Sequence, residues 1–368
     1  MAPRLRARAG HALVNRVNVD TGLRMAIDAG FDFAGWAPAG PAPHASEFAQ
    51  WLARGDQGGL AWMTRDADRR ADLRCGDPDA RSLLVVGLGY SVAAPDPAIW
   101  NDPRRGRVAR YAWGPDYHDR MGTLLKRLAE RVRAEAGWAV PPRMFLDTAP
   151  VLERDWASAA GLGFQGRSTM FIHPHHGTYT WLGGLVLPVP APEPHPPAGA
   201  RPPAECPPEC KRCLRACPTL ALREPYRLDV RRCLSYFTIE HRGVIPPGIA
   251  GHMDRWIFGC DACQECCPWN GPDTKKGGAD WIRFEPDLHA PVLEEAIQIT
   301  EIDFRRRYRE TPVWRAKWQG FVRNAVAALA ARGDPADRDL LKRMAAGHAH
   351  PLVRAQAEAW RAGIADSV

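Results

Sequence analysis

The sequence has no apolar run that approaches the length of a membrane-spanning helix, although 45% of its 368 residues are hydrophobic. No apolar core follows the arginines near its start, so we expect no secretory signal. Cysteine is almost absent outside one stretch, since nine of the ten cysteines fall between Cys206 and Cys267. We therefore expect a cytoplasmic protein with no membrane partner, in which residues 1–20 form a basic tail.

The clustered cysteines form two runs that each end in Cys-Pro. The first reads Cys206-Pro-Pro-Glu-Cys210-Lys-Arg-Cys213-Leu-Arg-Ala-Cys217-Pro218. The second reads Cys260-Asp-Ala-Cys263-Gln-Glu-Cys266-Cys267-Pro268, and Cys233 lies between the two runs. Short Cys-x-x-Cys spacings wrap one corner of an iron–sulfur cluster, and the cysteine before the proline points toward a second cluster. The proline stops that turn from continuing as helix. The pattern predicts two [4Fe–4S] clusters in a bacterial ferredoxin-like unit.

Structural zinc and disulfide bonds are the alternatives for these cysteines. Pairs spaced Cys-x-x-Cys also bind zinc, but a zinc site has no need of the repeated Cys-Pro ending. Disulfides require an oxidising compartment, which a long chain without a signal peptide does not indicate. Two clusters need eight thiolates, so one of Cys266 and Cys267 is surplus.

Residues 21–195 have the pattern of one α/β (α+β) unit. The apolar run 82–90 predicts a buried strand, and apolar residues at helical spacing predict a helix over 118–136. Further expected elements are strands at 143–147, 169–172 and 180–187, and a helix over 150–161 that Pro150 opens.

The proline-rich stretch 188–208 predicts a linker into the cysteine unit, which we assign to residues 196–278. Residues 279–368 have helical patterns, with helices expected at 321–330, 337–345 and 351–360. The pieces around Val322 and Val353 recur after 31 residues, which is near the period of stacked helix-pair repeats of the HEAT type. Such a stack would pack against the rest of the protein.

The chain carries a formal net charge of +7, and part of the excess gathers in one segment. Between Glu301 and Arg323, seven Lys and Arg residues alternate with Tyr308, Trp314 and Trp318. Cations interleaved with aromatic rings suit a phosphate backbone with unstacked bases. A solvated helix face whose aromatic rings turn to the core would give the same pattern.

Several long stretches of the chain resemble the family of epoxyqueuosine reductases, from about residue 20 to the end. They are Arg110-Tyr-Ala-Trp-Gly-Pro-Asp-Tyr-His118, Phe145-Leu-Asp-Thr-Ala-Pro-Val-Leu-Glu-Arg154, Ala160-Gly-Leu-Gly-Phe-Gln-Gly166, Arg231-Arg-Cys-Leu-Ser-Tyr-Phe-Thr-Ile-Glu240 and Phe258-Gly-Cys-Asp-Ala-Cys-Gln-Glu-Cys-Cys-Pro-Trp-Asn270. This resemblance is more specific than the cysteine pattern alone.

The resemblance implies a function. The family reduces the epoxide of epoxyqueuosine, at the wobble position of certain tRNAs, to the cyclopentene of queuosine. It uses cobalamin, bound here by residues 21–195, and two [4Fe–4S] clusters that pass it electrons. An external flavodoxin- or ferredoxin-type donor would supply those electrons, helical repeats at 279–368 would help hold the tRNA, and we expect a monomer.

The resemblance also implies ligands for the two clusters. Cys206, Cys210, Cys213 and Cys267 would hold one cluster. The cluster nearer cobalamin would be held by Cys217, Cys233, Cys260 and Cys263. Two departures from the family stand out, because Pro207 occupies the expected position of the first cysteine and Cys266 is extra. Cys75 matches no family cysteine, and we expect it to be a small buried residue.

Asp147 matches the family's proton donor, and a carboxylic acid that donates at neutral pH needs a raised pKa. The alternative is that Asp147 caps the helix opened by Pro150. The positions that match cobalamin contacts in the family are Arg70, Ala109, Asp147, Phe171, Leu182, Leu185, Ser235, Cys260 and Asp261.

Two other functions remain possible at this point. A corrinoid reductive dehalogenase would share both cofactors, but it would usually carry a twin-arginine export signal, which this sequence lacks. A ferredoxin-type electron carrier, or a tRNA-binding module with such an insert, would have the clusters and no cobalamin.

Overall fold

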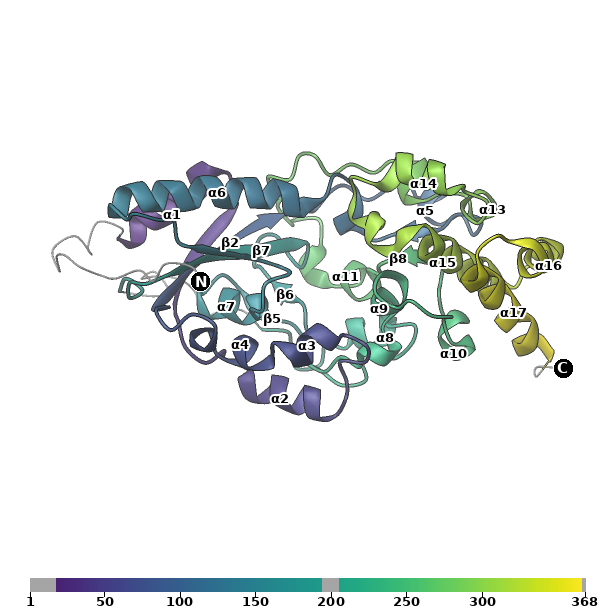
Figure 1. The fold of residues 1–368 in the computed structure, drawn as a ribbon, viewed down its shortest axis with the longest axis horizontal. Coiled ribbons are helices and arrows are strands. Elements are labelled where there is room, and N and C mark those ends of the chain that lie inside the picture. Colours follow the sequence, from purple (N-terminus) through teal and green to yellow (C-terminus); the bar gives the residue numbers. More distant parts are fainter. Residues whose placement is uncertain (1–17, 194–204, 366–368) are drawn as a thin grey trace.

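The structure is a computed structural model, and it describes residues 18–193 and 205–365. Most of the expected basic tail and residues 194–204 of the expected linker therefore lie outside the described residues. No helix within the described ranges is long and apolar enough to cross a membrane. Figure 1 shows the sheet and its covering helices at one end of the molecule and the C-terminal helices at the other.

A four-stranded antiparallel sheet forms the centre of the N-terminal half. Its strands, in spatial order, are β1 (Phe33–Pro38), β2 (Ser82–Gly89), β7 (Thr180–Leu187) and β4 (Arg143–Leu146). The strands β2 and β7 pair along their whole length, from Ser82 opposite Leu187 to Gly89 opposite Thr180. The strands predicted from apolar runs are confirmed, whereas β1 was not predicted.

Helices cover both faces of this sheet. Alternate side chains of a strand point to opposite faces, so each strand contributes side chains to two cores. Leu84, Val86 and Leu88 of β2 belong to a core shared with α1 (Val19–Ala29) and α6 (Tyr117–Ala136). Leu83 and Val85 belong to a second core with α7 (Glu153–Ala159). Figure 1 shows α1 and α6 above the sheet and α7 below it. This arrangement explains why the whole of β2 is buried and why its residues after Ser82 are apolar or glycine.

The helix expected to open at Pro150 begins three residues later, at Glu153. The reason is that Arg70 Nη1 donates hydrogen bonds to the carbonyl oxygens of Ala149 and Val151, each at 3.3 Å. Because the Ala149 and Val151 carbonyl oxygens accept from Arg70, they take no part in the hydrogen bonds of the helix. The side chain of Asp147 consequently caps no helix, and the capping alternative is wrong.

The remaining elements of this half are short. They are α2 (Ala45–Ala53), α3 (Ala61–Arg65), α4 (Ala67–Ala71), the 3-10 turns η1 (Leu73–Cys75) and η2 (Arg110–Ala112), α5 (Pro97–Trp100), β3 (Arg107–Val108), β5 (Phe164–Gln165) and β6 (Phe171–Ile172). The strand expected at 169–172 is reduced to β6, because Thr169 adopts a left-handed backbone (φ 65°).

The cysteine-rich part has little regular structure of its own. Its elements are α8 (Arg212–Ala216), η3 (Val230–Arg232), α9 (Leu234–Ile239), α10 (Pro247–Ala250), β8 (Trp256–Phe258), α11 (Ala262–Glu265) and η4 (Pro268–Asn270). The strand β8 pairs in parallel with β3 of the N-terminal half. Helix α8 ends just before Cys217 and Pro218, as the Cys-Pro ending predicts.

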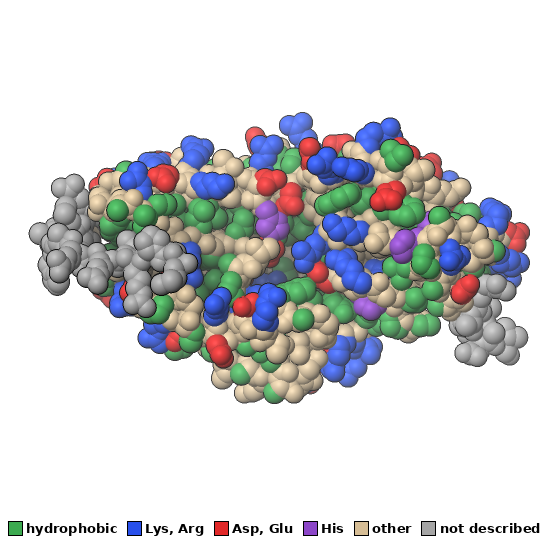
Figure 2. Space-filling view, in the orientation of Figure 1, with side chains coloured by type: hydrophobic (Ala, Val, Ile, Leu, Met, Phe, Trp, Pro, Cys, Tyr) green, Lys and Arg blue, Asp and Glu red, His purple; other side chains and the backbone are tan. Residues whose placement is uncertain are grey.

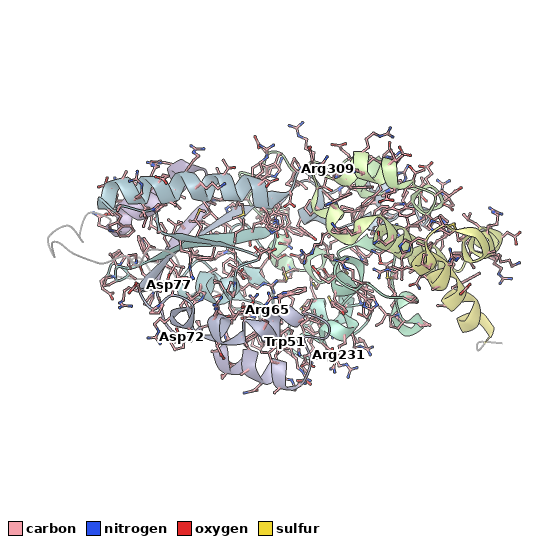
Figure 3. All side chains as sticks on the ribbon, in the orientation of Figure 1. Trp51, Arg65, Asp72, Asp77, Arg231 and Arg309 are labelled. Carbon is pink, nitrogen blue, oxygen red and sulfur yellow. The ribbon has the colours of Figure 1, made fainter. Side chains whose placement is uncertain are left out.

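A buried carboxylate joins this part to the N-terminal half. Asp56 follows α2 and is fully buried, and it accepts hydrogen bonds from Arg54 at 2.9 Å, Arg227 at 3.2 Å and Arg231 at 3.0 Å. Nearby, Trp51 Nε1 donates to the carbonyl oxygen of Leu228 at 2.7 Å. Figure 3 shows Trp51 and Arg231 close together where α2 and α3 approach α8. We call this contact the Asp56 seam.

The C-terminal part is helical, as expected. It contains α12 (Pro286–His289), α13 (Leu293–Ala296), α14 (Glu301–Tyr308), η5 (Pro312–Ala316), α15 (Lys317–Arg332), η6 (Pro335–Asp337), α16 (Arg338–Gly347) and α17 (Pro351–Ala365). Helix α15 is buried on all sides from Gly320 to Leu329. Its Arg323 donates to the carbonyl oxygens of Phe237, His241 and Gly243, so these helices pack against the cysteine-rich part, as the sequence predicted.

Candidate active site and cluster sites

A cleft of about 1260 Å³ lies where the N-terminal half meets the cysteine-rich and C-terminal parts. Small-molecule sites usually measure about 300–1,000 Å³, so this cleft has room for an unusually large ligand or for two partners at once. Its wall includes α2, α3, the start of α6, the loop after β4, and residues near Glu240 and Trp314. Figure 2 shows a hollow near the middle of this face, with Lys and Arg side chains at its edges.

Asp147 lies on the wall of this cleft, at the point where β4 ends. Its backbone is left-handed (φ 36°), a strained conformation of the kind that gathers at functional sites, and its side chain is 57% exposed. The Oδ2 atom accepts a hydrogen bond from the Tyr117 hydroxyl at 2.8 Å and lies 3.1 Å from His118 Nε2. The sequence placed Tyr117 and His118 in a family motif but gave them no role.

His118 is held between two carboxylates. Its Nε2 faces Asp147, and its Nδ1 lies 2.7 Å from Oδ1 of Asp116, which also caps α6. A ring that donates to carboxylates through both nitrogens must carry two protons. Burial opposes the charged form, but these two contacts outweigh burial and raise the pKa of His118 to about 9.

The pKa of Asp147 moves in the opposite direction. Partial burial favours its neutral form, yet the hydrogen bonds from His118 and Tyr117 outweigh burial and hold the pKa below its ordinary value. The residues of the chain around Asp147 bind its charged form, so they do not themselves raise this pKa. At neutral pH the labile proton of the pair resides on His118.

Beneath this loop, Arg70 and Glu153 each keep one polar atom free. Arg70 is 5% exposed and orients the loop through Ala149 and Val151, while its Nε has no hydrogen-bond partner among the described residues. The same holds for Oε1 of Glu153. Both residues line the cleft. Arg70 was expected in the site, whereas Glu153 was not.

The other expected cobalamin contacts lie behind the cleft wall rather than on it. Ala109, Phe171 and Leu185 are buried, and Leu182, Ser235 and Cys260 are partly buried. Leu182 packs in the core on the α7 side of the sheet, and Leu185 in the core on the α6 side. The side chains of the two leucines therefore lie on opposite sides of the sheet.

Asp261 is buried and fully engaged by its neighbours. Its Oδ2 accepts from the backbone N–H of Arg110 at 2.7 Å, and its Oδ1 accepts from Gln264 Nε2 at 2.8 Å. Burial raises the pKa of Asp261 to about 6 against these hydrogen bonds. The carboxylate thus fixes α11, which carries Cys263, against the segment after β3.

The clustered thiols separate into two groups of four. Cys206, Cys210, Cys213 and Cys267 line one small cavity, and the charges of the first three act on Cys267, whose pKa burial and these charges raise to about 11. Cys263 is instead influenced by burial and then by Cys233, Asp261, Cys217 and Cys266, which raise its pKa. Burial, Cys263 and Cys233 raise the pKa of Cys260. Cys206 thus lies with Cys210, Cys213 and Cys267 despite its shifted position in the sequence.

The two unmatched cysteines lie in different surroundings. Cys266 lies beside the group that contains Cys267, and its Sγ donates to the carbonyl oxygen of Cys263 at 3.6 Å. Cys75 is exposed, so the expectation that it is buried is wrong. The short turn Leu73–Cys75 turns only Leu73 to the core.

The basic and aromatic segment divides between the two alternatives that the sequence left open. Tyr308 and Trp318 turn inward, and they donate hydrogen bonds to the carbonyl oxygens of Leu288 and Ile299. Arg323 is 1% exposed and is not a surface cation. The residues of this segment on the cleft wall are Arg309, Trp314, Arg315 and Lys317. Figure 3 places Arg309 above the centre of the molecule and Arg65 below it.

Two family descriptions match the chain. "Epoxyqueuosine reductase QueG, DUF1730" matches residues 70–148, and "4Fe-4S double cluster binding domain" matches residues 206–270. The epoxyqueuosine reductase of Xanthomonas campestris pv. campestris is 37% identical over 320 residues, which cover 86% of this chain and 87% of the relative. That of Gloeobacter violaceus is 38% identical over 292 residues, 77% of this chain and 86% of the relative.

Solved structures give the same fold over most of the chain. A crystal structure of epoxyqueuosine reductase with an epoxyqueuosine-modified tRNA-Tyr stem loop superposes with a TM-score of 0.79 at 26% identity, covering 91% of this chain and 86% of that one. The Bacillus subtilis epoxyqueuosine reductase, solved with an aspartate catalytic loop swung out of the active site, gives 0.76 at 25% identity, covering 91% and 87%.

Proposed function

Because this chain belongs to the epoxyqueuosine reductase family, it is an oxidoreductase that reduces epoxyqueuosine in tRNA, and we propose that it does so in the cleft around Asp147. The observation that carries this proposal is the hydrogen-bonded set of Asp116, Tyr117, His118 and Asp147 on the wall of a cleft of about 1260 Å³. Family membership replaces the dehalogenase and electron-carrier alternatives.

The chain carries a 4Fe-4S double cluster binding domain and therefore two [4Fe–4S] clusters. We assign Cys206, Cys210, Cys213 and Cys267 to the cluster nearer the surface, and the inner one to Cys217, Cys233, Cys260 and Cys263. The division of the thiols into these two groups supports this assignment. Thiolates are the ligands that such clusters require.

We assign cobalamin to the same cleft. The size of the cleft suits a macrocycle, and the free Nε of Arg70 offers an unused donor for a polar group of the ligand. The wall behind that ligand would be shaped or supported by Ala109, Phe171, Leu182, Ser235, Cys260 and Asp261. Leu185 would support the sheet from its opposite face. When bound, cobalamin would supply a strongly reducing metal centre to the epoxide.

The residues of this chain supply the proton. The proton of His118 can pass across the 3.1 Å contact to Asp147 Oδ2 and from there to the epoxide oxygen as its C–O bond opens. Tyr117 orients the same carboxylate oxygen. Arg70 fixes the loop from below, which keeps the carboxylate in position.

The tRNA would enter from the open side of the cleft. The cations Arg65, Arg309, Arg315 and Lys317 line the cleft and suit phosphate groups, and Trp314 offers a ring for an unstacked base. Arg315 already pairs with Glu240 at 3.1 Å, so it is the least available of the four. Residues 279–368 thus contribute to tRNA binding chiefly through the segment from Arg309 to Lys317. We propose that the repeat-like helices of this part hold that segment in place.

The test is anaerobic reconstitution with iron, sulfide and cobalamin, followed by incubation with epoxyqueuosine tRNA and a strong reductant. Mass analysis of the released nucleosides should show the loss of one oxygen atom from epoxyqueuosine. An unchanged nucleoside, with clusters and corrin both bound and the tRNA intact, would contradict the proposal.

A further inference from the structure

Glu153 is a carboxyl group in the cleft to which the reaction as described gives no task. It is the first residue of α7, six residues after Asp147, and it lines the same cleft. Its Oε1 is buried without a hydrogen-bond partner, and among the described residues no cation lies within 4.0 Å of its carboxylate. A buried carboxyl group without a paired cation keeps its proton.

The charged groups that face Glu153 are few. Asp147 faces it from the loop, Arg70 from α4 and Arg154 from its own helix. The two arginines are engaged elsewhere, since Arg70 donates to the loop carbonyls and Arg154 Nη1 donates to the carbonyl oxygen of Thr169 at 2.8 Å. Burial, and then the negative charge of Asp147, raise the pKa of Glu153 to about 8. Glu153 is therefore mostly neutral at pH 7.

The reaction needs more protons than one residue pair holds. Reduction of an epoxide to an alkene consumes two electrons and two protons, breaks both C–O bonds and releases the oxygen as water. His118 and Asp147 together hold one labile proton at neutral pH, because Asp147 is ionised when His118 is protonated. A second proton must therefore reach the site in each turnover.

We propose that Glu153 is the second proton reservoir of this site. In the first step, the proton of His118 passes through Asp147 to the epoxide oxygen, and one C–O bond becomes a hydroxyl group. In the second step, the proton of Glu153 moves within the cleft to the Asp147 carboxylate, which gives it to that hydroxyl as the second C–O bond breaks and water leaves. The electrons come from the clusters through the bound cofactor, and Glu153 and His118 are reprotonated from solvent. This inference rests on the proposed function.

The first test is spectroscopic and does not depend on turnover. Infrared difference spectra of the tRNA-free holoprotein, recorded during a pH titration, should contain a carboxylic-acid carbonyl band that disappears near pH 8. Glu153→Gln should remove that band, and Glu135→Gln, at an exposed position on α6, should leave it unchanged. A holoprotein with no such band near pH 8 would overturn the proposal, whether or not the variant folds.

The second test is the pH profile of a single turnover with an epoxyqueuosine stem loop. The wild-type rate should fall as pH rises through 8, because Glu153 loses its proton. Glu153→Gln, with normal iron and corrin content, should be slower by about tenfold to a hundredfold, and its rate should fall only near pH 9, where His118 loses its proton. Wild-type rate and profile in the variant would refute the proposal. Failure of the wild-type protein to convert the substrate would instead contradict the proposed function, and the infrared band would still test Glu153.

Discussion

Two carboxyl groups, the buried Asp56 and the partly buried Glu153, have opposite electrostatic surroundings. At the Asp56 seam, three arginines from two parts of the chain bind one fully buried carboxylate. Burial favours its neutral form, but the bonds from Arg54 and Arg227 outweigh burial and lower the pKa of Asp56. In the cleft, Glu153 has a free oxygen and a raised pKa. Asp56 therefore fixes structure, whereas Glu153 keeps a proton available.

A similar contrast explains why Asp147 is ionised while the nearby Glu153 is neutral. His118 and Tyr117 stabilise its charged form, and the nearby Glu153 remains neutral because two charges cannot be accommodated together at low cost. Titratable groups whose pKa values move apart are typical of sites that hold both an acid and a base. The seam has no such divergence, since all of its contacts favour the ionised carboxylate.

Removal of the carboxylate of Asp147 should have the largest effect on function. We expect Asp147→Asn to lower the single-turnover rate by about 10²- to 10⁴-fold, because the amide cannot pass on a proton. Thermal unfolding should change little, since the side chain is more than half exposed. Asp119→Asn, at an exposed position in the first turn of α6, is the control, and a rate near wild type in Asp147→Asn would remove Asp147 from the mechanism.

Asp56→Asn should have the largest effect on stability. The substitution leaves three arginines without their anion and should cost roughly 2–3 kcal/mol, because hydrogen bonds to charged groups contribute about 1.5–3 kcal/mol each and the arginines remain partly solvated. Glu153→Gln should not lower stability at pH 7, because the folded state keeps Glu153 neutral while the unfolded state ionises it, and Gln removes the cost of that difference. Equilibrium unfolding of both variants measures the difference, and equal losses would erase the distinction between the two regions.

The stability of the protein should depend on pH differently through Glu153 and through Asp56, and this effect should be smaller than those of the substitutions above. The folded-state pKa of Glu153 lies above its ordinary value, so the stability linked to its neutral form is complete below about pH 4.5 and is lost as pH rises through about 8. The pKa of Asp56 lies below 3.8, so its contribution is complete above that pH and is lost only on further acidification. Between about pH 4.5 and 8, melting temperatures should therefore fall in wild type but less in Glu153→Gln, and this fall should end above about pH 8. An identical decline in both proteins over this range would contradict the assignment.

The sequence predicted those parts of the fold that local pattern determines. The buried strand at 82–90, the helix over 118–136 and the three C-terminal helices followed from apolar periodicity, and the structure confirms them. The cysteine spacing predicted two clusters, which the matched double-cluster domain supports. These features depend on residues close together in the chain.

The sequence could not predict features that arise from contacts distant in the chain. The late start of α7 depends on Arg70, and Arg323 was counted among the seven cations of the basic segment although it binds backbone carbonyls eighty or more positions away. The hydrogen bonds that lower the pKa of Asp147 were not predicted, because His118 and Tyr117 reach it only after α6 packs against the sheet. The resemblance supplied Asp147, but it gave no role to His118 or Glu153.

The position of cobalt in the holoprotein tests the central claim most directly. Anomalous X-ray maps of anaerobically grown crystals, recorded at the cobalt and iron edges, locate both metals independently. We predict one cobalt peak inside the cleft whose wall carries Asp147 and Arg70, with the iron of two clusters at the two thiol groups, the inner group nearer the cobalt. A cobalt peak outside that cleft, or iron at only one of the thiol groups, would contradict the account.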